Sequence, residues 1–120
     1  MLQTNNYFEV RAEVGIMVVK ILTQKIIQDG DIQAMGEQLH AFADSGRDAR
    51  VLVDWSQVDF VSAAFLGKLI TFLRKLQERG GRMVFCGVHP EIYEVFAITK
   101  LNRLFDIRDT ETEALSALAP

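Results

Sequence analysis

The sequence predicts a layered α/β domain whose mixed, mostly parallel β-sheet is flanked by about four helices. The apolar runs Val51–Val53 and Met83–Cys86 enclose a long amphipathic segment. Strand, helix and strand at these lengths indicate a βαβ unit, in which the two strands lie parallel. Before this unit, an alternating segment and an apolar run meet at a tight turn around Gly15, which indicates an antiparallel hairpin. The sheet is therefore expected to contain both kinds of pairing.

In the N-terminal part of the chain, the sequence predicts this hairpin, with a loose leader before it. We expect residues 1–6 to form a loose leader, because no periodic pattern is present there. From Phe8 to Val14, apolar residues alternate with charged ones, which is typical of a strand with one face in water. The run Ile16–Leu22 is almost wholly apolar, so we expect this second strand to lie nearer the centre of the sheet.

A first helix is predicted between the hairpin and the βαβ unit. Asp31 is its expected N-cap, and Asp44-Ser45-Gly46 is expected to end it. Its buried stripe is predicted to consist of Ile32, Met35, Leu39 and Phe42.

The helix of the βαβ unit has the clearest pattern in the sequence. Its core-facing residues at helical spacing are Leu66, Leu69, Ile70, Leu73 and Leu76. Phe65 and Phe72 lie between this stripe and a basic strip formed by Lys68, Lys75 and Arg79. Two interpretations stay open: the two phenylalanines belong to the periphery of the core, or they form a partner-docking edge with the lysines.

The C-terminal part predicts two more helices and a strand. Pro90 suits the first turn of a helix, and Thr110 with Glu113 predicts a capping box for the last one. The expected buried residues of these helices are Ile92, Val95, Phe96, Leu115 and Leu118. A short strand is predicted at Phe105–Arg108. The predicted order is ββαβαβαβα, in a single domain spanning residues 1–120.

Composition and charge exclude several classes of protein. The chain is 49% hydrophobic and 24% charged, as is ordinary for a globular domain. A net charge of −3 argues against nucleic-acid binding, which normally requires a basic excess. No apolar run is long enough to span a bilayer, and the N-terminus lacks the pattern of a signal peptide. We therefore expect a cytoplasmic protein without membrane insertion, and its single cysteine agrees with a reducing compartment.

The segment Val58–Gly67, which reads VDFVSAAFLG, resembles the signature of the STAS domain family (sulfate transporter and anti-sigma factor antagonist). That signature reads approximately V-x-F-[IL]-D-S-[ST]-G-L-G and follows a strand that ends in aspartate. Leu52–Ser56 resembles the family's LDL-S stretch, and Gly80–Val88 resembles its GG-x-L-x-L-x-G segment. Pro90–Phe105 resembles the P-E-V…L-x-x-L-F ending. The resemblance covers roughly the last two thirds of the chain, in the family's order and spacing.

The chain departs from the family pattern at the position that regulates it. In the family, an anti-sigma kinase phosphorylates the serine that follows the signature aspartate. Aligning the motifs on Leu66-Gly67 places Ser62 at the aspartate and Ala63 at that serine. Because alanine has no hydroxyl, the resemblance implies that the standard phosphoserine switch is missing. The loop Gln24–Gly30, which borders the partner surface in the family, lacks the usual L-D pair.

Ser62 directly precedes the central helix and has two interpretations. We expect its hydroxyl to accept a hydrogen bond from a first-turn amide, a cap worth on the order of 1 kcal/mol. The alternative is a displaced phosphorylation site, because a phosphate there would meet free amides and the positive end of the helix dipole. In that case Ser62→Asp should weaken partner binding.

The other candidate residues favour structural roles. Ser56 and Asp59 are expected to form turns, and Asp54 is expected to brace the loop that follows it. A receiver-type phosphoacceptor role for Asp54 would require an acidic pair after the first strand, and Leu22-Thr23-Gln24 offers none.

Cys86 and His89 precede a predicted helix start, where a thiol can be acidified. His89 alone makes a poor catalytic partner, so we expect a half-buried cysteine and a surface histidine. Together with the distant His40 they provide too few ligands for a metal. We expect no cofactor and no metal.

The resemblance implies a non-catalytic bacterial signalling module. Its expected role is that of an anti-sigma factor antagonist, which binds an anti-sigma factor or serine kinase and so influences sigma-factor-dependent transcription. The expected partner-binding residues are Ser56, Asp59, Ser62, Ala63, Ala64, Phe65, Lys68, Phe72 and Lys75. Two alternatives stay open: an accessory or scaffold STAS subunit of a stress-sensing assembly or lipid-transport ATPase complex, and an enzyme that uses Cys86 or Asp54. Self-association is compatible with either binding role.

Overall fold

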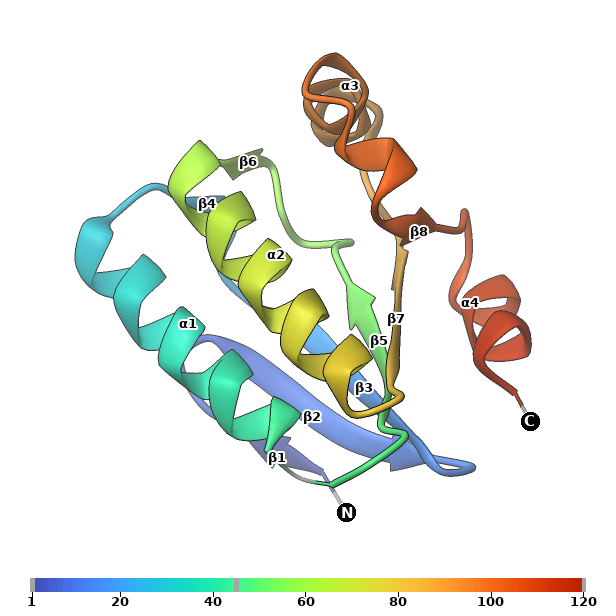
Figure 1. Cartoon of the computed structure of the whole chain (residues 1–120). Helices are drawn as coiled ribbons and strands as arrows, with labels where there is room; N and C mark the ends of the chain where they lie inside the picture. Colours follow the sequence, from blue (N-terminus) through green and yellow to red (C-terminus); the bar gives the residue numbers. More distant parts are fainter. Residues whose placement is uncertain (1, 45, 120) are drawn as a thin grey trace.

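The computed structural model describes residues 2–44 and 46–119, which form a β-sheet with helices on both faces (Figure 1). The main sheet has six strands in the order β1-β2-β3-β5-β7-β8. Their bounds are Gln3–Thr4, Phe8–Glu13, Ile16–Ile21, Arg50–Asp54, Arg82–Cys86 and Asp106–Ile107. The pairs β1–β2 and β2–β3 are antiparallel, and β3–β5, β5–β7 and β7–β8 are parallel. The predicted mixed, mostly parallel sheet is confirmed.

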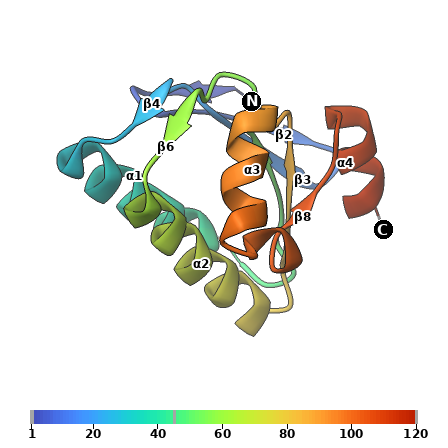
Figure 2. The ribbon, with the colours of Figure 1, turned by 90° about the horizontal axis from the view of Figure 1, so that it is seen from above.

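The helices divide between the two faces of this sheet. Helices α1 (Asp29–Ala43) and α2 (Ala63–Glu78) lie side by side on one face (Figures 1 and 2). Buried residues of α3 (Pro90–Ile98) join the same core, and a short 3-10 helix, η1 (Leu101–Arg103), follows it. Helix α4 (Glu111–Leu118) covers the opposite face, against β5 and β7. Within the described part of the chain, no helix has the length and apolar character needed to cross a membrane.

A second, two-stranded sheet lies beside the starts of α1 and α2. It pairs β4 (Lys25–Ile26) with β6 (Phe60–Val61) in parallel, with Lys25 opposite Phe60 and Ile26 opposite Val61. Strands this short have no usable sequence period, and neither of these two was predicted. Their pairing joins the loop before α1 to the loop before α2 (Figure 2).

The main core is centred on aromatic side chains. The Trp55 ring lies 5.1 Å from Phe85, 5.4 Å from Phe96 and 6.3 Å from Phe65, measured between ring centroids. All four side chains are fully buried. They come from the loop after β5, from β7, from α3 and from α2, so this cluster joins one face of the sheet to two helices.

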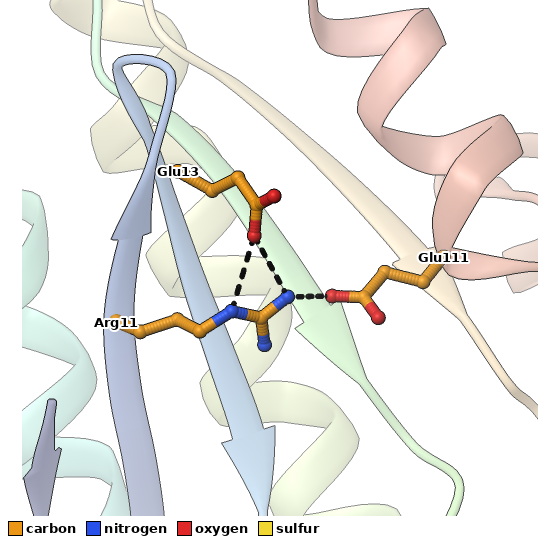
Figure 3. A network of polar contacts seen from close by, with 3 residues as sticks. All are labelled: Arg11, Glu13 and Glu111. Carbon is orange, nitrogen blue, oxygen red and sulfur yellow. Dashed lines mark hydrogen bonds and ion pairs between the residues drawn. The ribbon is translucent and has the colours of Figure 1, made fainter.

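A smaller core lies beneath α4 on the other face. Its buried residues are Ile16, Val18, Leu52, Val84, Cys86, Ala114 and Leu118. The Arg82 guanidinium of β7 donates to the carbonyl of Ala117 and so joins the helix to the sheet, while at the start of the helix the amide of Glu113 donates to the hydroxyl of Thr110. Arg11 of β2 reaches across to Glu111 and also binds Glu13 (Figure 3). The Thr110 hydroxyl thus caps α4 by accepting from the Glu113 amide, which is one of the two hydrogen bonds of the predicted capping box.

The prediction of a loose N-terminal leader is wrong. Residues 3 and 4 do not belong to a loose leader, because they pair with Glu9 and Val10 as strand β1. The amides of Tyr7 and Phe8 donate to the side chain of Asn5, which fixes the turn between β1 and β2. A side-chain cap of this kind orders a segment that has no hydrophobic period.

The boundaries of the first helix also differ from the prediction. Asp31 is not its N-cap: α1 begins at Asp29, and the Asp31 carboxylate in its first turn accepts a hydrogen bond from the Tyr7 hydroxyl. Gln28 occupies the N-cap position without a side-chain hydrogen bond. Asp44 is the C-cap, while Ser45, predicted to help end the helix, lies outside the described residues.

The turn of the β2–β3 hairpin is strained. Val14 and Gly15 both have positive φ angles, 50° and 78°, as a two-residue type I′ turn requires. Asparagine and glycine adopt this region readily, whereas a β-branched residue does so at a cost of roughly 1–3 kcal/mol. Val14 is also 86% exposed, so packing does not offset the strain.

We expect Val14→Asn to raise the free energy of unfolding by about 1 kcal/mol, because asparagine relieves this strain. Urea unfolding followed by circular dichroism measures the change. Val14→Thr is the matched control, since it removes apolar surface but keeps the β-branch, and it should leave stability unchanged. Equal stability of the asparagine variant and the native chain would contradict the assignment of strain.

Candidate functional site

The candidate site lies where the parallel strands end and three helices begin (Figures 1 and 2). Parallel crossovers bring the carboxyl ends of β3, β5 and β7 to one edge of the sheet, together with the amino ends of the helices that follow them. The connection between β5 and α2, residues 55–62, contains the first three predicted partner-binding residues, and Ala63 and Ala64 follow it.

Hydrogen bonds fix the first half of this connection. The amide of Ser56 donates to the carboxylate of Asp54 at 2.9 Å, so Asp54 braces the loop as predicted. The amide of Trp55 donates to the carbonyl of Cys86 at 2.9 Å, and the His89 ring lies 2.7 Å from the carbonyl of Ser56. The loop is therefore fastened to the connection between β7 and α3.

The second half of the connection is held by β4. The amides of Asp59 and Phe60 both donate to the carbonyl of Gln24, at 2.8 and 3.2 Å, and the amide of Ser62 donates to Ile26 at 2.9 Å. Within the two-stranded sheet, Ile26 and Val61 point into the core.

The outward side of the two-stranded sheet carries exposed apolar side chains. Phe60 is 53% exposed, and Ile27, just after β4, is 47% exposed. Ala63 and Ala64 in the first turn of α2 are exposed beside them. Adjacent apolar side chains that remain in water are typical of a binding site. We call the group formed by Ile27, Ser56, Asp59, Phe60, Ala63 and Ala64 the β4–β6 surface.

Ser62 occupies the predicted N-cap position of α2 but does not cap it with its side chain. Its backbone is extended, and its Oγ is buried with no hydrogen-bond partner among the described residues. The prediction of a side-chain cap is therefore wrong. The first turn of α2 also contains no acidic residue. A kinase must reach the oxygen to which it transfers phosphate, so this burial argues against Ser62 as an acceptor in the folded chain.

Phe65 and Phe72 do not belong to a docking edge, because both side chains are fully buried. The reason is that α2 contacts the sheet and also α1, so its buried face is wider than one stripe. Of the two interpretations left open by the sequence, the one that assigns Phe65 and Phe72 to the core is therefore correct.

Of the two lysines predicted as partner-binding residues, Lys68 packs against a neighbouring helix and Lys75 lies away from the β4–β6 surface. The alkyl chain of Lys68 packs against Gly36 of α1 and is partly buried. Lys75 is near the other end of α2, roughly 18 Å along the helix from Ala63. Its ammonium group pairs with Asp44 at 2.9 Å, and this contact lowers the pKa of that carboxyl. The expected contribution of Lys75 to this surface is not supported.

Two residues of the β4–β6 surface were not predicted, Ile27 and Phe60. Phe60 stands inside the motif of residues 58–67, and an aromatic residue next to a buried valine was the available signal. Ile27 becomes its neighbour only through the pairing of β4 with β6, which the sequence does not reveal.

A shallow depression adjoins this surface. It is lined by Asp59, His89, Pro90 and Glu91 and has a volume of about 240 Å³. His89 is exposed, as predicted, and its ring is held by the carbonyl of Ser56.

Cys86 is more deeply buried than predicted, with only 1% of its surface exposed beneath α4. Burial, together with the nearby carboxylates of Asp54 and Glu111, raises the pKa of its thiol from 9.0 to about 12, while Arg11 acts in the opposite direction. The nucleophilic form of a cysteine is the thiolate. A thiol in this position is therefore unsuited to nucleophilic catalysis.

We expect Cys86 in the native chain to resist thiol reagents at pH 8, since a thiol of pKa about 12 is ionised in only about one molecule in ten thousand. The colour reaction with dithiobis(nitrobenzoate) measures it, in buffer and in urea. Because the folded state raises this pKa, the stability from the neutral thiol is complete below pH 9 and declines as pH rises toward 12. An Ala41→Cys variant, with an exposed thiol, is the positive control, and equally fast labelling of both cysteines would contradict the prediction.

Comparisons with known proteins find relatives of the chain in sequence and in fold. The model of the STAS domain family matches residues 7–114. BtrV of Bordetella bronchiseptica, assigned as an anti-sigma factor antagonist, is 26% identical over 94 residues, which cover 78% of this chain and 80% of BtrV. The anti-sigma F factor antagonist of Paenibacillus polymyxa is 20% identical over 114 residues, 95% and 96% of the two chains.

A solved structure shares the fold. The anti-sigma-factor antagonist (STAS) domain protein from Planctomyces limnophilus aligns with a TM-score of 0.85 at 22% identity. The alignment covers 94% of this chain and 98% of that one. At this level of identity the likeness establishes the architecture.

Proposed function

The chain belongs to the STAS domain family, and we propose that it acts in the bacterial cytoplasm as an anti-sigma factor antagonist. In this role it binds an anti-sigma factor and thereby frees a sigma factor for transcription. Relatives that match most of this chain's length have that description, which supports the role. The proposed activity is binding, without catalysis.

The observation that carries the proposal is the exposed apolar group on the β4–β6 surface. Phe60 and Ile27 remain about half exposed in a domain whose other motif residues Val58, Val61 and Phe65 are buried. The site lies at the helix start that contains the family motif. The buried thiol of Cys86 makes the enzymatic alternative weaker.

The binding is proposed to lack a phosphoserine switch. Ala63 is exposed at the first position of α2 but has no hydroxyl, and the hydroxyl of Ser62 is buried. A serine-kinase partner would therefore find no acceptor at this helix start and would stay bound in the presence of ATP.

The test uses purified anti-sigma factors from the genome that encodes this chain. Titration calorimetry with the native chain should find one that binds, and mass spectrometry after incubation with Mg·ATP should find no phosphate on residues 56–64. Ala63→Ser should become phosphorylated if that partner is a kinase, whereas the matched variant Ala64→Ser should not.

Two outcomes would count against this function. No binding to any anti-sigma factor of that genome would contradict it. Binding instead to a transporter ATPase, or to other STAS chains in a stress-sensing assembly, would assign the chain to an accessory or scaffold role. Phosphate on Ser62 would contradict the proposed absence of a switch.

A further inference from the structure

We propose that the β4–β6 surface binds a cationic protein surface that offers a socket for Phe60. This inference rests on the proposed function, because it describes the chemistry of the partner that the same surface binds. Two features support it: an apolar centre that the backbone holds outward, and a rim of unpaired carboxylates.

The apolar centre is held in place by the two-stranded sheet. Lys25 and Phe60 form one register pair and Ile26 and Val61 the next, and the second pair is buried. Because neighbouring residues of a strand point to opposite sides, Phe60 cannot turn inward while Val61 stays in the core. Its backbone is also fixed by the hydrogen bond to Gln24. An aromatic side chain held outward in this way loses little conformational entropy on binding, as is typical of interface hot spots.

The rim around this centre is acidic. Asp59 directly precedes Phe60, and Asp29 begins α1 two residues after Ile27. Glu91 lines the adjoining depression together with Asp59. All three carboxylates are exposed, and none has an ion-pair partner in the described parts of the chain.

The cations of this region offset the rim only in part. Lys25 is exposed on the outward side of the two-stranded sheet, and His89 lines the depression. The three carboxylates therefore outnumber the single lysine on this rim. At the other end of α2 the charges are balanced: a depression there is lined by Arg47, Asp48, Glu78, Arg79 and Gly80, with as many cations as anions.

Charge complementarity indicates which kind of partner can bind this surface. A second copy in a two-fold contact would bring the same three carboxylates against each other, which is unfavourable. Nucleic acid is itself a polyanion and would be repelled. A protein whose apolar socket is surrounded by lysine or arginine satisfies both the apolar centre and the rim.

The experiment measures binding kinetics with the anti-sigma factor that binds the native chain in calorimetry. Phe60→Ser should weaken binding at least about tenfold, mainly through faster dissociation. Ile98→Ser is the matched control, because Ile98 is 77% exposed but lies at the end of α3 outside this surface, and it should bind like the native chain. Ile27→Ser provides a second variant of the apolar centre.

The charged rim is tested by the salt dependence of association. Asp59→Lys should slow association about tenfold at low salt, and the difference should fade as ionic strength rises. Asp109→Lys makes the same change in net charge at an exposed position just before α4, so it should have no effect on association.

The outcomes separate this inference from the proposed function. If the native chain binds and Phe60→Ser binds equally well, or if Asp59→Lys associates faster, the inference is overturned while the proposed function stands. Sedimentation that finds a dimer of the native chain, lost in Phe60→Ser, would assign the surface to a second copy and overturn it. If no anti-sigma factor binds, both fall together.

Discussion

Trp55→Ala is expected to lower the free energy of unfolding by about 3–5 kcal/mol. Trp55 is fully buried, and its ring contacts Phe65, Phe85 and Phe96. Alanine would leave a cavity where the sheet, α2 and α3 meet, and rigid neighbours can close only part of it. Domains of this size are stable by about 5–15 kcal/mol, so the variant should unfold at much lower urea than the native chain. Far-ultraviolet circular dichroism follows this change without relying on tryptophan fluorescence.

Trp55→Phe is the matched control for this cavity. It keeps an aromatic ring but removes the indole N–H, which is buried and has no hydrogen-bond partner within residues 2–44 and 46–119. Loss of an unsatisfied polar group offsets part of the lost packing, so we expect a cost well below that of alanine. A loss of less than about 1 kcal/mol for Trp55→Ala would contradict the central role of this ring.

Gly81→Ala is expected to destabilise the fold by about 2–3 kcal/mol. A Cβ atom at Gly81 would lie 2.7 Å from the carbonyl oxygen of Ala49 and 3.1 Å from that of Leu76. Both contacts are with backbone, and the carbonyl of Ala49 also accepts the amide of Arg82 at the start of β7. Relief of the clash would therefore disturb the junction between α2 and β7. Urea unfolding measures the loss.

Gly67→Ala is the matched control, and it is expected to change stability in the opposite direction. Gly67 lies inside α2, and a Cβ atom there would meet nothing within 4 Å. Alanine is favoured over glycine in a helix, so the free energy of unfolding of this variant should rise by up to about 1 kcal/mol. If the two glycine variants changed stability in the same direction, the assignment of close packing to Gly81 would be wrong.

Much of the fold could be predicted from the sequence because its main elements are long and periodic. The alternation in residues 8–14 gave the outer hairpin strand, and the stripe of Leu66, Leu69 and Leu73 gave α2. The Thr110 cap was recognisable because a side-chain oxygen precedes the last helix. These signals are local, so neighbouring residues are enough to reveal them.

The errors arose where contacts between distant segments decide the outcome. Strands β1, β4 and β6 have two residues each and exist through their pairing. Phe72 is buried because α2 meets α1 as well as the sheet, which no helical stripe specifies. The orientation of the Ser62 hydroxyl is a choice of rotamer, and the local sequence favoured the capping one. For the site, the motif predicted the position of Ala63 and Ala64 but did not predict Ile27 as a neighbour.

The pairing of β4 with β6 makes the proposed binding region a discontinuous epitope. A synthetic peptide that copies residues 58–67 would lack the β4 strand that fixes Phe60, and its helical turn would be too short to persist in water. Such a peptide should compete poorly with the folded chain for a partner. A mimic of this region needs both strands and the start of α2 on one rigid scaffold, which makes grafting onto a small α/β protein the suitable design route.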